Sequence, residues 1–187
     1  MNTLLSKAKK SIKLGTKSDS SRLIILMGLP GSGKSYISSY LHDKYGFTIL
    51  SGENITFSFY GTEKCSVDEY TLAYKKLRQI AAKLLEDGYS VVIDGTNLKY
   101  IFRQQIYNEV NCNSTMLLYL KVDDKTALNR VSQRGIDFKD LKNIKSSISK
   151  KVFEKFKDSL EEPLPGENAI TIISDDNLFS KIDSIFE

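Results

Sequence analysis

The sequence is poor in the residues on which several kinds of active site depend. It contains only two cysteines, Cys65 and Cys112, and a single histidine, His42. These residues suffice neither for a disulfide scaffold nor for a four-ligand zinc site, so a reducing, cytoplasmic environment is expected. A hydrolase triad would have to use His42, which falls in the middle of an expected helix, so triad chemistry is disfavoured.

Long hydrophobic segments are also absent. The apolar run from Leu23 to Met27 has five residues, whereas a membrane-spanning helix needs roughly 18. The beginning of the chain is rich in lysine and serine and lacks both an apolar signal-peptide core and arginine, so neither secretory nor mitochondrial targeting is supported. With 187 residues, 41% of them hydrophobic, the sequence predicts one globular domain with a substantial core.

The excess charge is confined to the first 21 residues. They carry five lysines and one aspartate, so residues 22–187 are charge-balanced although the net charge is +4. We interpret residues 1–21 as a basic flexible tail, disordered and solvated, ahead of a folded domain at residues 22–187. The alternative is an arm for a membrane surface or a nucleic acid, with Leu4, Leu5, Ala8 and Ile12 as a weak apolar stripe.

Short apolar strands alternate with amphipathic helices from residue 22 onward. A capping box of Ser66 and Glu69 opens a long helix that ends at Gly88. Strands are expected at residues 23–27, 47–50, 90–93, 116–122 and 169–173. Further helices are expected at residues 34–45, up to about 110, at 124–135, at about 141–160 and at the end of the chain. This alternation predicts an α/β domain whose parallel sheet is covered by helices on both faces.

A phosphate-binding motif, G-x-x-x-x-G-K-[ST], separates the first strand from the first helix of this domain. Glycines let backbone N–H groups point at phosphate oxygens, and the helix N-terminus adds a partial positive charge. Lys34 is expected to reach the β- and γ-phosphates of a nucleotide, and the hydroxyl of Ser35 to bind Mg²⁺. The nucleotide-binding residues predicted here are Gly28, Leu29, Pro30, Gly31, Ser32, Gly33, Lys34 and Ser35.

A carboxylate follows the third expected strand. Asp94 comes directly after Val91, Val92 and Ile93, and it therefore falls at the carboxyl edge of the sheet, beside the phosphate loop. This position favours a role in holding Mg²⁺ together with Ser35. The alternative is that Asp94 caps the helix that follows it.

Arginine is scarce, with five residues against 22 lysines, which draws attention to each position. Arg130 and Arg134 are four residues apart on one expected helix, so they share a face and could present cations to a transferring phosphoryl group. A solvated basic face is the alternative. Arg103 is either structural or substrate-facing. Glu53, after the second strand, is a candidate base for the acceptor hydroxyl, or else a surface carboxylate in a loop.

These motifs together resemble a family. GLPGSGKS, LSGEN, KLLEDGYSVVIDGTNL, LNRVSQRG and FKDSLEEPLPGE are similar to segments of the P-loop kinases that include phage-type polynucleotide kinase, zeta-toxin kinases and bacterial AAA-domain kinases. The resemblance covers about residues 22–176. It implies a three-layer P-loop NTPase fold with a five-stranded parallel sheet, flanking helices and a helical lid, and it implies ATP and Mg²⁺.

The resemblance also assigns roles to individual residues. Lys34 and Ser35 match the phosphate-loop pair, Asp94 matches the Walker B acid, and Arg134, with Arg130 alongside, matches the catalytic lid arginine. The sequence departs from the family on the acceptor side, where Glu53 replaces the usual aspartate base. Three residues on, Thr56 replaces an arginine that holds acceptor phosphate in many members.

We therefore predict an ATP-dependent kinase that transfers the γ-phosphate to a hydroxyl, and the neutral core and Thr56 favour a small-molecule acceptor. A 5′-hydroxyl polynucleotide kinase and a nucleotide-binding or ATP-hydrolysing protein without acceptor transfer are the alternatives. A GTPase is disfavoured because the sequence has no N-K-x-D motif, and a mechanical AAA+ ATPase because the chain is too short for a helical second subdomain.

Overall fold

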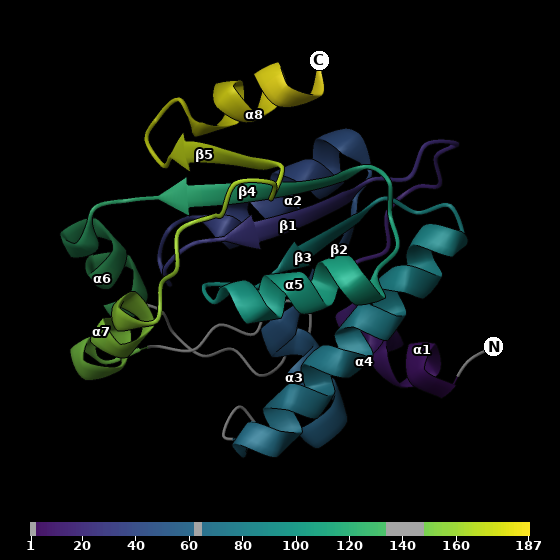
Figure 1. The fold of residues 1–187 in the computed structure, drawn as a ribbon, viewed down its shortest axis with the longest axis horizontal. Helices are drawn as coiled ribbons and strands as arrows, with labels where there is room; N and C mark the ends of the chain where they lie inside the picture. Colours follow the sequence, from purple (N-terminus) through teal and green to yellow (C-terminus); the bar gives the residue numbers. More distant parts are fainter. Residues whose placement is uncertain (1–2, 62–64, 134–147) are drawn as a thin grey trace.

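The computed structural model describes residues 3–61, 65–133 and 148–187, and Figure 1 shows their arrangement. Five strands form one parallel sheet in the order β2-β3-β1-β4-β5. The strands are β1 (Leu23–Met27), β2 (Thr48–Ser51), β3 (Val91–Asp94), β4 (Thr115–Lys121) and β5 (Ala169–Ile173). The helices are α1 (Thr3–Ala8), a 3-10 turn η1 (Lys9–Ser11), α2 (Lys34–Tyr45), α3 (Gly52–Tyr60), α4 (Val67–Glu86), α5 (Tyr100–Glu109), α6 (Asp124–Ser132), α7 (Lys150–Asp158) and α8 (Leu178–Phe186).

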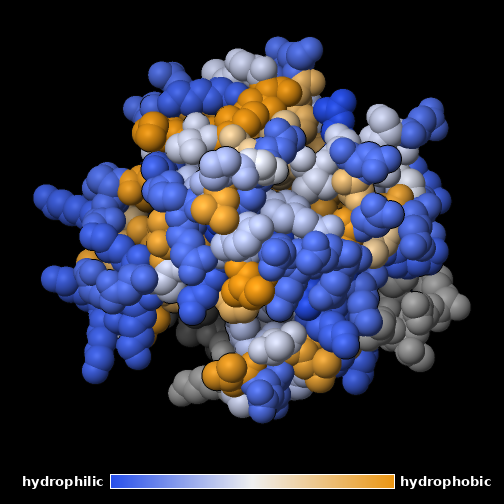
Figure 2. Space-filling model, in the orientation of Figure 1, coloured by the Kyte–Doolittle hydropathy of each residue, from blue (hydrophilic) through white to orange (hydrophobic). Residues whose placement is uncertain are grey.

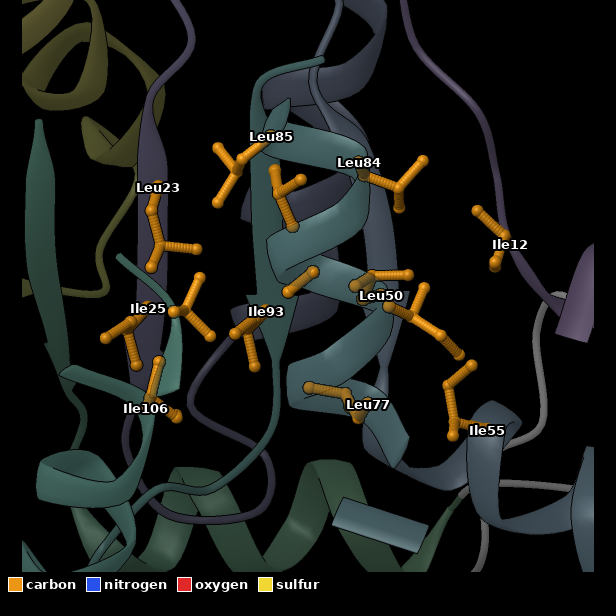
Figure 3. Packing of buried hydrophobic residues seen from close by; sticks show 14 of the residues in the cluster. Ile12, Leu23, Ile25, Leu50, Ile55, Leu77, Leu84, Leu85, Ile93 and Ile106 are labelled. Carbon is orange, nitrogen blue, oxygen red and sulfur yellow. The ribbon is translucent and has the colours of Figure 1, made fainter. Parts of the chain in front are cut away.

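The sheet is buried on both faces because its side chains alternate between two hydrophobic clusters. Leu23 and Ile25 of β1 pack with α4 and α5 (Figure 3), and Met27 belongs to the same cluster. Ile24 and Leu26 pack with α2 and α8 on the opposite face. This gives three layers, helix on sheet on helix, and confirms the fold class expected from the sequence. No helix in the described ranges is long and apolar enough to cross a membrane.

A third cluster lies beyond the carboxyl ends of the strands. It joins Leu29 of the phosphate loop and Leu98 of the β3–α5 loop to Ala127 of α6 and Phe153 of α7. The helices that follow β4 are therefore packed against the loop that the sequence assigns to phosphate binding. The helix expected at about 141–160 is described from Lys150 to Asp158, and residues 134–147 are outside the described ranges.

The second strand is followed by a helix that the sequence analysis did not predict. The hydroxyl oxygen of Ser51 accepts a hydrogen bond from the backbone N–H of Asn54 at 3.3 Å and so caps α3. Glu53 therefore lies in the first helical turn, and the interpretation of a carboxylate in a loop is wrong. The capping box of Ser66 and Glu69 at the start of α4 is confirmed.

The beginning of the chain is packed, which corrects the expectation of a disordered, solvated tail. Ala8 is fully buried and Ile12 is 7% exposed, and both belong to the cluster with Leu50 and Ile55 (Figure 3). Backbone hydrogen bonds then tie the segment to the domain, from Ile49 N–H to Lys13 C=O at 2.9 Å and from Thr16 N–H to Gly46 C=O at 2.9 Å. The lysines made the segment look solvated, but two apolar residues on one side suffice to anchor it.

Replacing Ile12 by alanine should lower the free energy of unfolding by about 2–4 kcal/mol, because a buried aliphatic side chain is lost and a cavity remains. Leu14→Ala is the matched control, since Leu14 is 52% exposed and its truncation should change stability by less than about 0.5 kcal/mol. Urea unfolding followed by circular dichroism measures both. Equal stabilities of the two variants would mean that the segment does not pack as described.

Candidate active site

The phosphate loop joins β1 to α2 in a conformation that depends on glycine. Gly31 has φ +86°, and a β-carbon there would collide with the carbonyl oxygen of Ala127 in α6. Gly33, with φ +98°, precedes α2, and no side-chain hydrogen bond caps this helix. The uncapped first turn leaves backbone N–H groups for an anion, and the absence of side chains lets that anion approach the backbone.

Lys34 lies inside the curve of this loop and is 8% exposed. Its Nζ donates hydrogen bonds to the carbonyl oxygens of Gly28 at 2.9 Å and Leu29 at 2.8 Å, and to the hydroxyl of Ser32 at 3.3 Å. Phosphate oxygens entering the loop would compete for this ammonium group as stronger, charged acceptors. The lysine is thus held ready at the position that the motif predicts.

Asp94 stands at the carboxyl end of β3, where its neighbour across the β2–β3 ladder is Ser51. Its Oδ2 accepts a hydrogen bond from the hydroxyl of Ser38 in α2 at 3.2 Å, which links the carboxylate to the helix that carries Ser35. Asp94 and Ser35 line one cavity. The observed bond to α2 argues against the alternative that Asp94 only caps the next helix.

The oxygen donors in this cavity suit magnesium. Mg²⁺ prefers hard oxygen ligands and is usually bound by one or two carboxylates together with substrate phosphates and water. The Asp94 carboxylate and the Ser35 hydroxyl are such donors, and they share the cavity with Lys34. The described ranges hold no cluster of three His, Cys, Asp or Glu side chains, which such a shared site does not require.

Glu53 lines the same cavity and belongs to α3 rather than to the phosphate loop. Its carboxylate is exposed, and its place in the first turn of α3 favours a negative charge through the helix dipole. Thr56, one turn further on, is 3% exposed and donates from Oγ1 to the Gly52 carbonyl oxygen at 2.7 Å. Glu53 is therefore brought to the site, whereas Thr56 is bound within its own helix.

The arginines have different surroundings. Arg130 is exposed, and its Nη1 donates to the Gly31 carbonyl oxygen at 3.3 Å, so it touches the phosphate loop without lining the cavity. Arg134 lies outside the described residues. Arg78 is 6% exposed and forms two hydrogen bonds to the carboxylate of Glu109, at 2.8 and 3.1 Å.

Arg103 is fully buried in an ion pair, which decides between its two interpretations in favour of the structural one. Nε and Nη2 each donate to one carboxylate oxygen of Glu167 at 2.8 Å. Nη1 donates to the carbonyl oxygens of Asn97 at 3.1 Å and Leu98 at 2.9 Å. Burial raises the pKa of Glu167, but hydrogen bonds from Arg103, the Leu164 backbone and Tyr107 bring it below its ordinary value.

Sequence reasoning missed two tyrosines of α4 that line the cavity, Tyr70 and Tyr74. The hydroxyl oxygen of Tyr74 lies 2.3 Å from where a β-carbon at Gly52 would be, too close for one to fit, and 3.3 Å from where one at Gly95 would be. Tyr70 donates a hydrogen bond to it at 3.2 Å. Burial raises the pKa of Tyr74 well above its ordinary value, so its hydroxyl stays protonated at neutral pH. Their four-residue spacing on a helix next to Glu53 was the available signal.

Comparisons with known proteins agree with this fold. A family described as "AAA domain" matches residues 23–163. A sugar kinase from Janibacter sp. superposes with a TM-score of 0.67 and 20% identity, covering 89% of this chain and 92% of that one. The Mycobacterium tuberculosis APS kinase CysC, in complex with AMPPNP and APS, gives 0.63 and 13%, covering 90% and 97%. Chaetomium thermophilum Kti12, in complex with ADP-AlF3, gives 0.61 and 21%, covering 87% and 97%.

These structural similarities confirm the three-layer P-loop NTPase fold that the resemblance implied. At these levels of identity they concern the fold alone. A search of curated proteins gives no match.

Proposed function

Because the chain belongs to the AAA-domain family of P-loop proteins, we propose that it is a kinase that transfers the γ-phosphate of ATP to a hydroxyl group of a small molecule. One observation carries the proposal: Lys34 and Ser35 at the start of α2, Asp94 at the end of β3 and Glu53 in α3 line one cavity. Phosphate binding, a metal site and a base for the acceptor are thereby combined. The nucleotide complexes of the APS kinase and of Kti12, which share this fold, support ATP as the donor.

The residues that line the cavity have different roles in the proposed reaction. The backbone N–H groups of the phosphate loop and the ammonium group of Lys34 bind the β- and γ-phosphates and spread their charge. Ser35 and Asp94 would hold Mg²⁺, which supplies positive charge to the phosphates. The oxygen of the acceptor hydroxyl forms a bond to the γ-phosphorus while the Glu53 carboxylate accepts the proton of that hydroxyl. The bond between the γ-phosphorus and the bridging oxygen of ADP breaks.

We also propose that Arg134 supplies charge to the transferring phosphoryl group, as the sequence pattern predicts, with Arg130 four residues before it in the sequence. The position of Arg130 against the Gly31 carbonyl oxygen supports this, because it places the end of α6 beside the phosphate loop. Arg130 itself serves the site by holding the loop.

Lys34→Ala should lower phosphate transfer by roughly 10²–10³-fold and weaken ATP binding, because a cation aimed at the phosphates is removed. Lys75→Ala is the matched control, since Lys75 is an exposed lysine on α4 that does not line the cavity. Calorimetry measures ATP binding, and γ-labelled ATP offered with a metabolite mixture measures transfer.

The same assay tests the alternatives. Efficient labelling of a 5′-hydroxyl oligonucleotide, weakened strongly by salt, would favour a polynucleotide kinase. Hydrolysis of ATP without any labelled organic product would favour a nucleotide hydrolase. Full transfer by Lys34→Ala would exclude the phosphate loop as the active site.

A further inference from the structure

A second cavity adjoins the first, between α4, α5 and the end of α7. It has a volume of about 440 Å³, within the range of small-molecule sites, roughly 300–1,000 Å³. Tyr70, Tyr74, Thr96 and Phe156 line both cavities. A molecule in the second cavity can therefore extend a group past the two tyrosines toward Glu53.

The walls of this second cavity are largely aromatic and aliphatic. The rings of Tyr70 and Tyr74 pack with their centroids 4.8 Å apart at 30°, forming one wall, and Phe102 of α5 faces the cavity as another lining residue. Tyr70 is 45% exposed, Phe102 48% and Val67 82%. Figure 2 shows apolar side chains exposed among hydrophilic ones on the face where α4 and α5 lie. Exposed apolar groups gathered around a concave site favour a ligand with a flat apolar body.

Charge in the described lining is sparse. The guanidinium group of Arg78 is paired with the carboxylate of Glu109 through two hydrogen bonds. Lys99, the second cationic residue of the lining, is exposed to solvent. A phosphorylated or polyanionic acceptor is recognised by several converging cations, often in bidentate geometry, and this lining does not offer them.

One buried polar atom of a residue that lines the cavity has no hydrogen-bond partner in the described part of the chain. It is Oδ1 of Asn97, a residue that is 3% exposed and lines the cavity. Nδ2 donates to the Leu26 carbonyl oxygen at 2.7 Å, and because that oxygen can only accept, the bond fixes which end of the amide is Oδ1. A buried acceptor without a donor costs roughly 1–3 kcal/mol, so a ligand O–H or N–H placed there is stabilised.

The backbone at Asn97 is also unusual. Asn97 has φ +44°, a left-handed conformation that is rare outside glycine and persists where surrounding contacts impose it. A β-carbon at Gly95 would lie 3.5 Å from the Asn97 Oδ1 and 3.3 Å from the Tyr74 hydroxyl. The side of Gly95 that lacks a β-carbon is therefore closely bordered by the Asn97 amide and the Tyr74 hydroxyl, next to the strand end that carries Asp94.

We propose that this second cavity binds the acceptor, and that the acceptor is an uncharged, ring-bearing alcohol with an additional O–H or N–H donor for Asn97. The inference rests on the proposed kinase function and specifies its substrate class. The ring packs between Tyr70 and Phe102, the donor meets Asn97, and the hydroxyl to be phosphorylated reaches Glu53. Its oxygen bonds to the γ-phosphorus, ADP leaves with the electron pair of the broken P–O bond, and Glu53 takes the proton.

Adenosine, thymidine and hydroxybenzyl alcohol serve as ring-bearing probes, and gluconate and a 5′-hydroxyl oligonucleotide as charged probes. We expect γ-labelled ATP to label at least one of the first group saturably and neither of the second. Phe102→Ala should raise the acceptor KM about tenfold while kcat and the KM for ATP change little, because roughly 1–2 kcal/mol of ring contact is lost. Ile101→Ala is the matched control: Ile101 is 50% exposed on the same helix and does not line the cavity.

The outcomes separate the two proposals. ATP binding with transfer only to gluconate or to the oligonucleotide would overturn the acceptor assignment and leave the kinase function standing. Equal acceptor KM values in Phe102→Ala and Ile101→Ala would also overturn it. Absence of ATP binding would contradict the kinase function, and the acceptor assignment would fall with it.

Discussion

Glu53→Gln is expected to reduce phosphate transfer by roughly 10²–10⁴-fold while ATP binding persists, because the amide keeps the shape of the side chain and cannot accept the acceptor proton. The placement of Glu53 gives the reason. It lies in the first turn of α3, its carboxylate is exposed, and it lines the cavity of the phosphate loop without belonging to that loop. Nucleotide affinity and transfer are measured separately, by calorimetry and by labelled ATP.

Two further variants sharpen this result. Glu53→Asp retracts the carboxylate by about 1.5 Å, and we expect lower activity, since a small displacement of a positioned base is costly. Glu86→Gln is the control: this carboxylate is 69% exposed at the last residue of α4 and lines neither cavity. If Glu53→Gln transferred phosphate as fast as Glu86→Gln, a different group would have to accept the proton.

Arg103→Met is expected to destabilise the protein by about 3–5 kcal/mol, because it leaves the buried Glu167 carboxylate without its cation. The loss is a large part of the total stability of a domain, so the variant is expected to be partly unfolded at physiological temperature. Arg78→Met is the comparison, since its partner Glu109 is 41% exposed and can be solvated. Its effect should be clearly smaller in urea unfolding.

A double variant, Arg103→Met with Glu167→Met, distinguishes the buried charge from the lost packing. Removing both charges should recover part of the stability, and the carbonyl groups of Asn97 and Leu98 that lose their donor keep the recovery incomplete. No recovery in the double variant would show that the ion pair is not what the single variant disrupts.

The same pair gives a pH dependence. The pKa of Glu167 is lowered in the folded protein from an ordinary value of 4.5, so the carboxylate contributes stability above about pH 4.5. That contribution is lost as the pH falls through the folded-state pKa. The double variant should therefore lose stability less steeply than the wild type on acidification, which unfolding curves at several pH values measure.

The sequence predicted the elements whose ends carry strong local signals. Helix α2 and strand β5 have the expected bounds, and Ser66 with Glu69 marked the start of α4. Helix α3 was not predicted because its segment ITFSFY is rich in β-branched and aromatic residues, a composition more typical of strands. Its capping by Ser51 and its contacts with α4 outweigh that preference.

The candidate site was predictable where one rule of topology applies and not where packing decides. The carboxyl ends of parallel strands meet at one edge, so Asp94 and the phosphate loop could be placed together from the sequence. The role of Tyr74 depends on how α4 lies over Gly52 and Gly95, and the unpaired oxygen of Asn97 depends on a single bond to Leu26. Neither relation has a counterpart in local sequence spacing.

The packed N-terminal segment also determines how the molecule meets its neighbours. Strand β2 is at one end of the sheet order, and an open strand edge is a template for pairing with another chain. Lys13 lies antiparallel to Ile49 in a single bridge, and the Gly15 N–H donates to the hydroxyl oxygen of Thr48 at 2.9 Å. The N-terminal segment thus covers part of the free edge of β2 with a charged, irregular stretch of chain. This cover opposes the pairing of β2 with a strand of another molecule.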